Sequence, residues 1–500
     1  FVMLFFMLTA GCEKILDVNP KQSIDGKDAI KTEADVDNLL IAAYAGIKGT
    51  NGGGEMYGGT FNTFAELLAI NTYYYTDGAI KVDSAEAHFN GTFTSLQDQE
   101  AKTLTSNDSY SLATWIRAYD VINILNQVLD NLDLIEDAAD KDRVEGEALG
   151  LRGTLYFELT RFWGLQYTGT SVDATNPGVP IVLTPTYTAE DAVKVARSSV
   201  QDCYTRAIQD LTDSKTLLSG LGKNSDWFSM YAASAMLSRV YLQQGRYDLA
   251  AAEANEVIES NMFALAATPL EAFNRDGVSP EFVFTLKQSA TSNAGESNAG
   301  IATFYASLNG IGRSDIQIQP QHLLIYEPLD LRGGEIDGTQ VDSLLLPNGG
   351  TNWSATIKDV KRMFYLGVGN VSGNIHTSKW GDAKTNIAVV RLAEMYLTRA
   401  EGNFESGVQV GPNTPTDDIN VIRRRAGLAY LSAGIADRTI IRNERHKELC
   451  WEGFWLHDLR RWHMNIMNNS QMILPYNAPE LVLPIPHREI LINDLLVPNP

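Results

Sequence analysis

The sequence predicts an all-α protein built as a scaffold of helical repeats, with loop-rich, partly β excursions. Three observations predict this fold. Residues 227–258 carry apolar side chains at helical spacing on two segments that Gly245 separates. Small alanines recur on both segments and let two helices approach closely. Stretches with a similar pattern of small and then aromatic residues occur at 148–163, 389–404 and 115–132.

The 227–258 segment resembles a tetratricopeptide unit, a helix pair that repeats with a period of about 34 residues. One unit cannot bury its apolar face alone, so the other stretches are expected to stack beside it. Their spacing is irregular because long segments without the pattern intervene. We therefore expect a rigid helical scaffold that carries its binding functions on the excursions.

Each further element has its own signal along the chain. An apolar stripe predicts a first helix over 33–47. Prolines in 173–185 predict an extended link into a long helix over 193–211. A strand is expected over 281–286, and the region 289–381, rich in Gly, Asn, Ser and Thr, forms the largest excursion. Helices are expected to resume at residue 385 and to continue over 417–427 and 440–464.

Composition narrows the class of protein. The chain has 61 acidic and 40 basic residues, a net charge of -21, which repels phosphate backbones, so no nucleic-acid partner is expected. Three cysteines are too few for a disulfide-stapled fold and are wrongly spaced for a zinc knuckle. Cys203 and Cys450 are interpreted as buried small hydrophobes, although a bridge between them stays open in an oxidising compartment.

The third cysteine, Cys12, follows an apolar run, FVMLFFML, and then Thr-Ala-Gly. A run this short cannot span a bilayer, which needs about 20 residues. It resembles the core of a bacterial lipoprotein signal, in which the cysteine becomes the lipidated first residue. We expect residues 1–11 to be a signal peptide truncated at its start. Behind it, an N-terminal region, 12–220, packs with a C-terminal region, 221–500, as one body on a lipid tether.

Six blocks of residues carry the strongest motif signal. Four lie in the C-terminal region: Glu444, Arg445, Glu448, Leu449, Glu452, Gly453 with Asp458 to Trp462; Arg391 to Glu394 with Tyr396, Leu397, Ala400, Glu401; Arg423, Arg425 to Leu428; and Leu483 to Pro486 with Glu489, Ile490. Two lie in the first half: Trp115, Tyr119, Ile122, Asn126; and Glu147, Ala148, Arg152, Tyr156, Phe157, Gly164. In this order the blocks resemble the RagB/SusD family over nearly the whole chain.

The resemblance implies a lipoprotein of the bacterial outer membrane, lipid-anchored and facing the exterior. Such a protein captures oligosaccharides and passes them to a SusC-like TonB-dependent receptor, its membrane partner. Some members of the family serve peptides instead. The resemblance also implies a protein that is not an enzyme and that needs no cofactor.

The carboxylates Glu444, Glu448 and Glu452 are spaced at four residues and share one helix face. A metal or catalytic interpretation needs two histidines at i and i+4 around a carboxylate, and HKELC lacks that arrangement. Buried carboxylates are usually paired, and Arg423 and Arg425 are available as partners. We therefore expect a structural Glu–Arg network here, with no metal.

Two other classes of function stay open. The GESNA sequence at 295–299 resembles a hydrolase nucleophile elbow but lacks the preceding strand, whereas paired carboxylates for glycoside hydrolysis are not excluded by sequence. Release of reducing ends would identify a glycoside hydrolase. A protein-interaction scaffold without a small ligand would instead capture a large membrane partner and show no affinity for glycans.

A glycan site needs aromatic faces for stacking against sugar C–H groups, beside amides or carboxylates for the hydroxyls. Two stretches offer this combination. Tyr73 and Tyr75 share one face if their backbone is extended, with Asp77 close by. Trp353 lies beside Asn352 in a glycine-rich segment that suits a loop better than a core. These five residues are the candidate ligand-binding residues.

Overall fold

The protein is described here by a computed structural model that covers residues 27–49, 54–70, 74–76, 79–81, 86–222, 226–275, 277–294, 297–308, 310–334, 341, 356–368, 373–468, 470 and 472–499. For 74–76 and 79–81 it describes the backbone only. Helices make up 51% and strands 7% of the structure, which confirms the expected class. No helix within the described ranges has the length and apolar character needed to cross a membrane.

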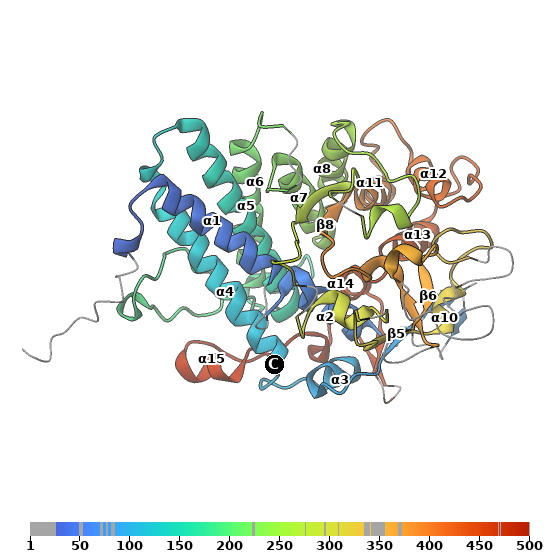
Figure 1. Cartoon of the computed structure of the whole chain (residues 1–500), viewed down its shortest axis with the longest axis horizontal. Coiled ribbons are helices and arrows are strands. Elements are labelled where there is room, and N and C mark those ends of the chain that lie inside the picture. Colours follow the sequence, from blue (N-terminus) through green and yellow to red (C-terminus); the bar gives the residue numbers. More distant parts are fainter. Residues whose placement is uncertain are drawn as a thin grey trace, which may run out of the picture.

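The first half of the chain forms helices whose longer members lie on the left in Figure 1, whereas two short ones lie near the lower centre. The helices are α1 (Glu33–Lys48), α2 (Phe61–Ala69), α3 (Thr94–Ala101), α4 (Ser109–Asp130), α5 (Ala138–Trp163) and α6 (Val200–Leu217). Helix α1 packs along α4, and α5 along α6. The guanidinium group of Arg152 donates to both carboxylate oxygens of Asp210 at 2.8 and 2.9 Å and to Asn126 Oδ1 at 2.9 Å. One buried side chain therefore joins α4, α5 and α6.

The helical repeat continues across the upper part of Figure 1 and ends with a short helix near its centre. Its members are α7 (Met230–Gln243), α8 (Tyr247–Glu259), α11 (Leu392–Ser406), α12 (Pro415–Arg425), α13 (Arg438–Leu449) and α14 (Trp455–Arg461). Gly245 separates α7 from α8 with φ of 69°, a conformation that favours glycine. Helices α8 and α11 pack so closely that a Cβ at Gly402 would lie 2.8 Å from Cβ of Ala251. These contacts confirm the tetratricopeptide-like scaffold.

The described strands form small antiparallel sheets inside and outside the 289–381 excursion. The strands are β1 (Tyr74–Thr76), β2 (Ala79–Lys81), β3 (Ala87–Phe89), β4 (Phe282–Leu286), β5 (Ile316–Ile318), β6 (Phe364–Leu366), β7 (Ile375–Thr377), β8 (Ile387–Arg391), β9 (Ile466–Met467) and β10 (Ile473–Leu474). One sheet has the order β3-β5-β7-β6, and the others pair β1 with β2, β4 with β8 and β9 with β10. Short helices complete the fold: α9 (Ile301–Tyr305), α10 (Pro320–Leu323) and α15 (His487–Ile492).

Two expected helices have different bounds because of their caps. Helix α6 begins at Val200, not at residue 193, because the Ser199 hydroxyl accepts the N–H of Asp202 at 3.0 Å and caps the helix there. The helix expected over 440–464 is instead the pair α13 and α14. Gly453, with φ of 84°, lies in the turn between them.

The helix expected over 389–404 begins only at Leu392, because the preceding residues belong to strand β8. Strand β8 pairs with β4, which confirms the strand expected at 281–286. Cys203 and Cys450 are both buried free thiols, as expected.

Candidate functional site

The candidate ligand residues lie mainly outside the described part of the chain. Tyr73, Asp77, Asn352 and Trp353 fall in ranges that the structure does not describe. Tyr75 lies in β1, where its backbone pairs with that of Ile80 in β2. The assignment of these five residues to a glycan site therefore stays a prediction.

The described chain beside residues 342–355 is anchored on the four-stranded sheet. After this range, the single 3-10 turn at Ile357–Asp359 packs Ile357 into a small apolar cluster with Tyr365 of β6 and Val360. Before it, the N–H of Leu331 donates to the carbonyl of Ala426 at 2.9 Å. Described residues before and after this range, Leu331 and Ile357, thus contact well-packed structure.

A groove of about 310 Å³ lies at the other end of the molecule, between α4, the link before α6, and α15. Figure 1 places α15 at the lower left, whereas β6 and α10 lie on the right. The groove is lined by Trp115, Ile116, Tyr119, Asp120, Pro180, Val182, Val193, Val195, Arg488, Glu489, Ile492, Asn493 and Leu496. No sequence motif indicated this groove, because the residues that line it come from three segments that are far apart in the chain.

The aromatic rings of this groove are already engaged. Trp115 is only 3% exposed and meets Trp163 edge to face at 5.5 Å between centroids. The Tyr119 hydroxyl donates to the Pro180 carbonyl at 2.9 Å. Stacking on a sugar needs an exposed ring face, which Trp115 does not offer. We therefore do not assign the glycan site to the groove.

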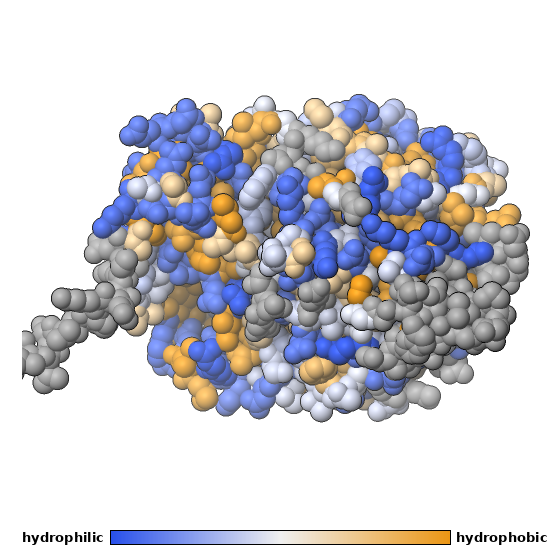
Figure 2. Space-filling model, viewed as in Figure 1, coloured by the Kyte–Doolittle hydropathy of each residue, from blue (hydrophilic) through white to orange (hydrophobic). Residues whose placement is uncertain are grey.

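The rim of the groove carries exposed aliphatic side chains beside exposed charges such as Arg488 and Asp494. Several aliphatic side chains on and beside α15 are about half exposed or more: Val193 at 75%, Leu491 at 71%, Ile492 at 57%, Leu495 at 48% and Val497 at 65%. Figure 2 shows hydrophilic and hydrophobic residues interspersed over much of the visible face. A group of exposed aliphatic side chains is typical of a surface that contacts another protein or a membrane.

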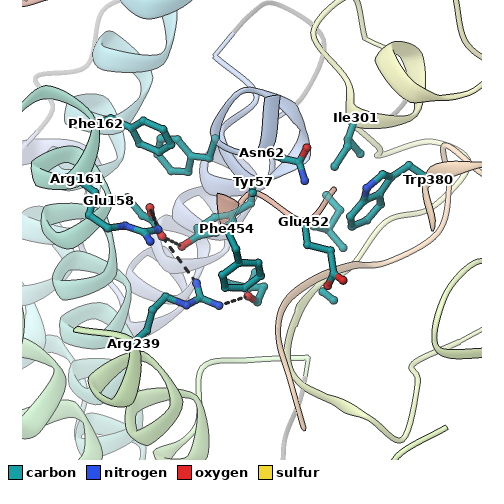
Figure 3. A pocket seen from close by; sticks show the side chains of 15 residues that line it. Tyr57, Asn62, Glu158, Arg161, Phe162, Arg239, Ile301, Trp380, Glu452 and Phe454 are labelled. Atoms are coloured by element: carbon teal, nitrogen blue, oxygen red, sulfur yellow. Dashed lines mark hydrogen bonds and ion pairs between the residues drawn. The ribbon is translucent and has the colours of Figure 1, made fainter. Parts of the chain in front are cut away.

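A second hollow lies inside the molecule and holds only about 30 Å³. Figure 3 shows its charged lining: Glu158 receives the Tyr57 hydroxyl at 2.7 Å and the guanidinium of Arg161. Arg239 lies on the same wall and pairs with Glu394 at 2.7 Å. This volume suits a water molecule and is too small for a sugar ring. The hollow therefore belongs to the polar interior of the scaffold.

The expected carboxylates of α13 and the turn that follows it lie in a buried network of ion pairs. Glu448 accepts from Arg425, from Arg391 Nη1 at 2.7 Å and from Arg332 Nη1 at 3.3 Å. Burial alone would raise the pKa of Glu448, but Arg425 and Arg391 outweigh it and hold that pKa well below its usual range. The carboxylate is therefore ionised at neutral pH although it is only 3% exposed.

The other two carboxylates extend this network. Glu452 accepts from Arg391 Nε at 2.8 Å and from Lys379 Nζ at 2.6 Å. Glu444 pairs with Arg332 Nη2 at 2.7 Å and lies 3.6 Å from Arg423 Nη1. Arg425 lies beside Glu448, whereas the short contacts of Arg423, at 2.6 and 2.9 Å, are with Glu327. The sequence missed Arg332, Arg391 and Lys379, which come from the excursion and from β8.

The contacts of these carboxylates are those of a structural network. Every carboxylate in it contacts at least one cation, and none faces an open cavity of ligand size among the described residues. Glu281, just before β4, accepts from both Arg391 and Arg425 at 2.7 and 2.9 Å. The charged groups therefore hold β4, β8, α12 and α13 in one arrangement.

Two protein-family models match parts of this chain. A family model described as starch-binding and associating with the outer membrane matches residues 14–242. The model of the SusD family matches residues 346–478. Together the two matched ranges span more than half of the chain.

Full-length relatives and solved structures agree with these matches. The SusD-like protein P2 of Formosa agariphila is 24% identical over 543 residues, covering 100% of this chain and 98% of the relative. A SusD superfamily protein of Bacteroides thetaiotaomicron has a TM-score of 0.74 at 23% identity, covering 94% of this chain and 100% of that one. A laminarin-binding SusD-like protein has a TM-score of 0.66 at 20% identity, covering 94% and 100%.

The network predicts that Glu448→Gln destabilises the fold. The variant keeps the side-chain volume but removes the charge that compensates three buried guanidinium groups, so we expect the free energy of unfolding to fall by about 3–5 kcal/mol. Urea denaturation measures this loss. The control, Asp494→Asn, removes an exposed pair with Lys194 and is expected to leave stability unchanged. Normal stability of Glu448→Gln together with lost ligand affinity would contradict a structural role.

Proposed function

Because this chain belongs to the SusD family, we propose that it is a cell-surface lipoprotein that binds glycan oligomers and delivers them to a SusC-like TonB-dependent transporter. The observation that carries the proposal is the match of the two family models along the chain, with the scaffold to which they correspond. The description of the first model, starch-binding and associating with the outer membrane, supports both the ligand class and the compartment.

The same proposal makes the protein a binding protein and not an enzyme. The neighbour that binds laminarin supports a glycan as the ligand class for this chain too. The conspicuous carboxylates at 444, 448 and 452 are held by cations in the interior, so they support no hydrolytic mechanism. Incubation with glycans followed by an assay for new reducing ends is expected to show no product. Product formation would favour a glycoside hydrolase instead.

We place ligand and transporter at different parts of the molecule. Two candidate glycan residues, Asn352 and Trp353, belong to the 289–381 excursion, whose described part lies on the right in Figure 1. The exposed aliphatic rim beside α15 lies at the lower left, on the helical scaffold. This separation would let the protein hold a glycan while the scaffold contacts the transporter.

Glycan binding is tested with Trp353→Ala and Tyr75→Ala. Each is expected to weaken glycan affinity by about 1–3 kcal/mol, the free energy of a buried ring contact, with unchanged melting temperature. Titration calorimetry against glycans identified on an array measures the effect. Tyr430→Ala removes a ring that is 64% exposed beyond α12 and serves as the control. Unaltered affinity in both variants would show that the glycan site lies elsewhere. Reduced melting temperatures would show that these rings belong to the hydrophobic core.

Transporter contact is tested with the double variant Leu491→Asp, Ile492→Asp. Charges on the exposed rim are expected to reduce co-purification of a TonB-dependent barrel from the native host at least about tenfold, which corresponds to about 1.4 kcal/mol. Ile435→Asp, at another exposed aliphatic residue (52%), is the control. Equal recovery of the barrel by the double variant and the control would exclude the rim as the contact.

Membrane attachment is tested with Cys12→Ala. An acidic chain gains nothing from the negative surface of a membrane, so attachment depends on the acyl chains or on a protein partner. We expect the variant to leave the membrane fraction in sedimentation experiments. If it still sediments with the outer membrane, a protein partner and not the lipid holds it there.

A further inference from the structure

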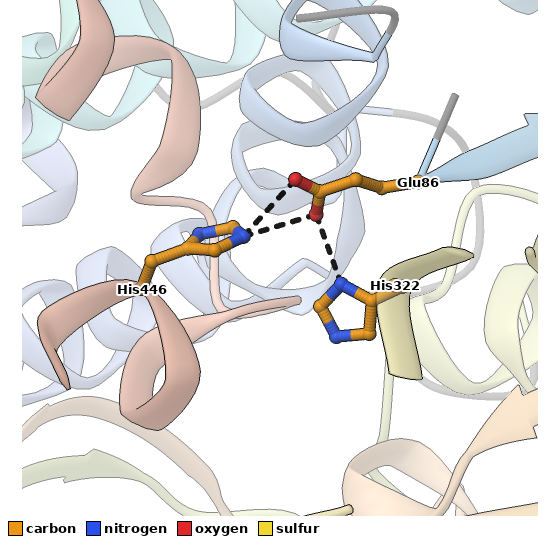
Figure 4. Close-up of side chains that lie close together, drawn as sticks. All are labelled: Glu86, His322 and His446. Atoms are coloured by element: carbon orange, nitrogen blue, oxygen red, sulfur yellow. Dashed lines mark hydrogen bonds and ion pairs between the residues drawn. The ribbon is translucent and has the colours of Figure 1, made fainter. Parts of the chain in front are cut away.

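Three buried side chains from distant parts of the chain meet at one point behind the four-stranded sheet. They are Glu86, directly before β3, His322 on α10 and His446 on α13. Figure 4 shows both imidazole rings directed at the carboxylate. His322 Nδ1 lies 3.0 Å from Glu86 Oε2, and His446 Nε2 lies 3.1 and 3.0 Å from the two oxygens of Glu86.

The surroundings fix the two rings in these orientations. The ring of His446 stacks on Trp455 with 3.6 Å between centroids, and His322 meets Trp451 edge to face at 4.8 Å. The second ring nitrogen of His322, Nε2, contacts the Tyr326 hydroxyl at 3.2 Å. A second partner of this kind is what orients a metal-binding histidine and selects its tautomer.

The spacing of the donor atoms is close to what a tetrahedral zinc site requires. With metal–donor distances of about 2.0–2.2 Å, neighbouring donors in a tetrahedron lie about 3.3 Å apart. Here one donor atom from each of the three residues lies within 4.8 Å of the others, and the nitrogen–oxygen pairs are at 3.0–3.1 Å. The nitrogen–oxygen pairs would need to move apart by only a few tenths of an ångström to reach this spacing.

Glu86 offers both of its carboxylate oxygens to the cluster. Because both Glu86 oxygens face His446, a bidentate carboxylate and two imidazoles would supply four donor atoms without a water molecule.

We propose that Glu86, His322 and His446 form a structural site for a divalent transition-metal ion, with zinc as the ion that this donor set fits. Two imidazole nitrogens and a carboxylate suit zinc and exclude magnesium, which prefers six oxygen ligands. A bound ion would join β3, α10 and α13, which the chain brings together from positions 236 and 360 residues apart. The site is independent of glycan binding.

Zinc binding is tested on the purified full chain after treatment with a chelator. Calorimetric titration with Zn²⁺ is expected to show one strong site per chain, and the melting temperature is expected to rise with Zn²⁺ but not with equal Mg²⁺. His322→Gln and His446→Gln are each expected to weaken zinc binding at least about tenfold. His463→Gln, which changes an exposed histidine, is the matched control and is expected to bind as the unaltered chain does.

The proposal fails if the unaltered chain has no strong zinc site, which would leave a cluster held by hydrogen bonds alone. It also fails if both variants bind zinc as tightly as the control, because the ion would then lie elsewhere. Should the variants not fold, anomalous diffraction from crystals of the unaltered chain grown with Zn²⁺ decides. A peak between Glu86, His322 and His446 supports the site, and its absence there overturns it.

Discussion

Ionised side chains in a dry interior need a partner of opposite charge within contact distance, and this constraint organises the C-terminal half of the protein. Arg391 shows the effect most clearly, because it is 2% exposed and contacts Glu281, Glu448 and Glu452 at 2.7–2.8 Å. An unpaired charge there would cost several kcal/mol. Strand β8, which carries Arg391, therefore has one favourable position relative to α13, and the sheet it forms with β4 follows from that position.

Much of the scaffold could be predicted from sequence because its signals are local. Gly245 ends one helix and starts a turn, and the apolar stripe of α1 repeats every three to four residues. The errors arose where a local signal was overlooked or outweighed. Ser199 followed by Asp202 marks the true start of α6, and the apolar run before Leu392 suits a strand as well as a helix, so only its pairing with β4 decides.

Sites that depend on tertiary contacts were less predictable. The spacing of Glu444, Glu448 and Glu452 indicated a shared helix face, and arginine was the expected partner. Glu444 and Glu448 lie on α13 at the spacing that the sequence implied, whereas Glu452 lies in the turn after the helix ends at Leu449. Which cations serve them depends on how β8 and the excursion return to the scaffold, and no spacing encodes that. The Glu86, His322 and His446 cluster has no sequence signal at all, because each residue is unremarkable in its own segment.

The buried contacts also constrain the order in which the chain can reach its native state. The N–H of Leu483 donates to the carbonyl of Phe162, and that of His487 to Ser106, so the last segment closes over helices formed from the first third. Contacts of such long sequence separation form late and slow folding. Residues 440–490 leave the ribosome after β8 and α12, so until then Arg391 and Arg425 have Glu281 as a partner but lack Glu448. Loss of residues 440–490 would therefore leave a protein whose earlier helices form but whose core cannot close.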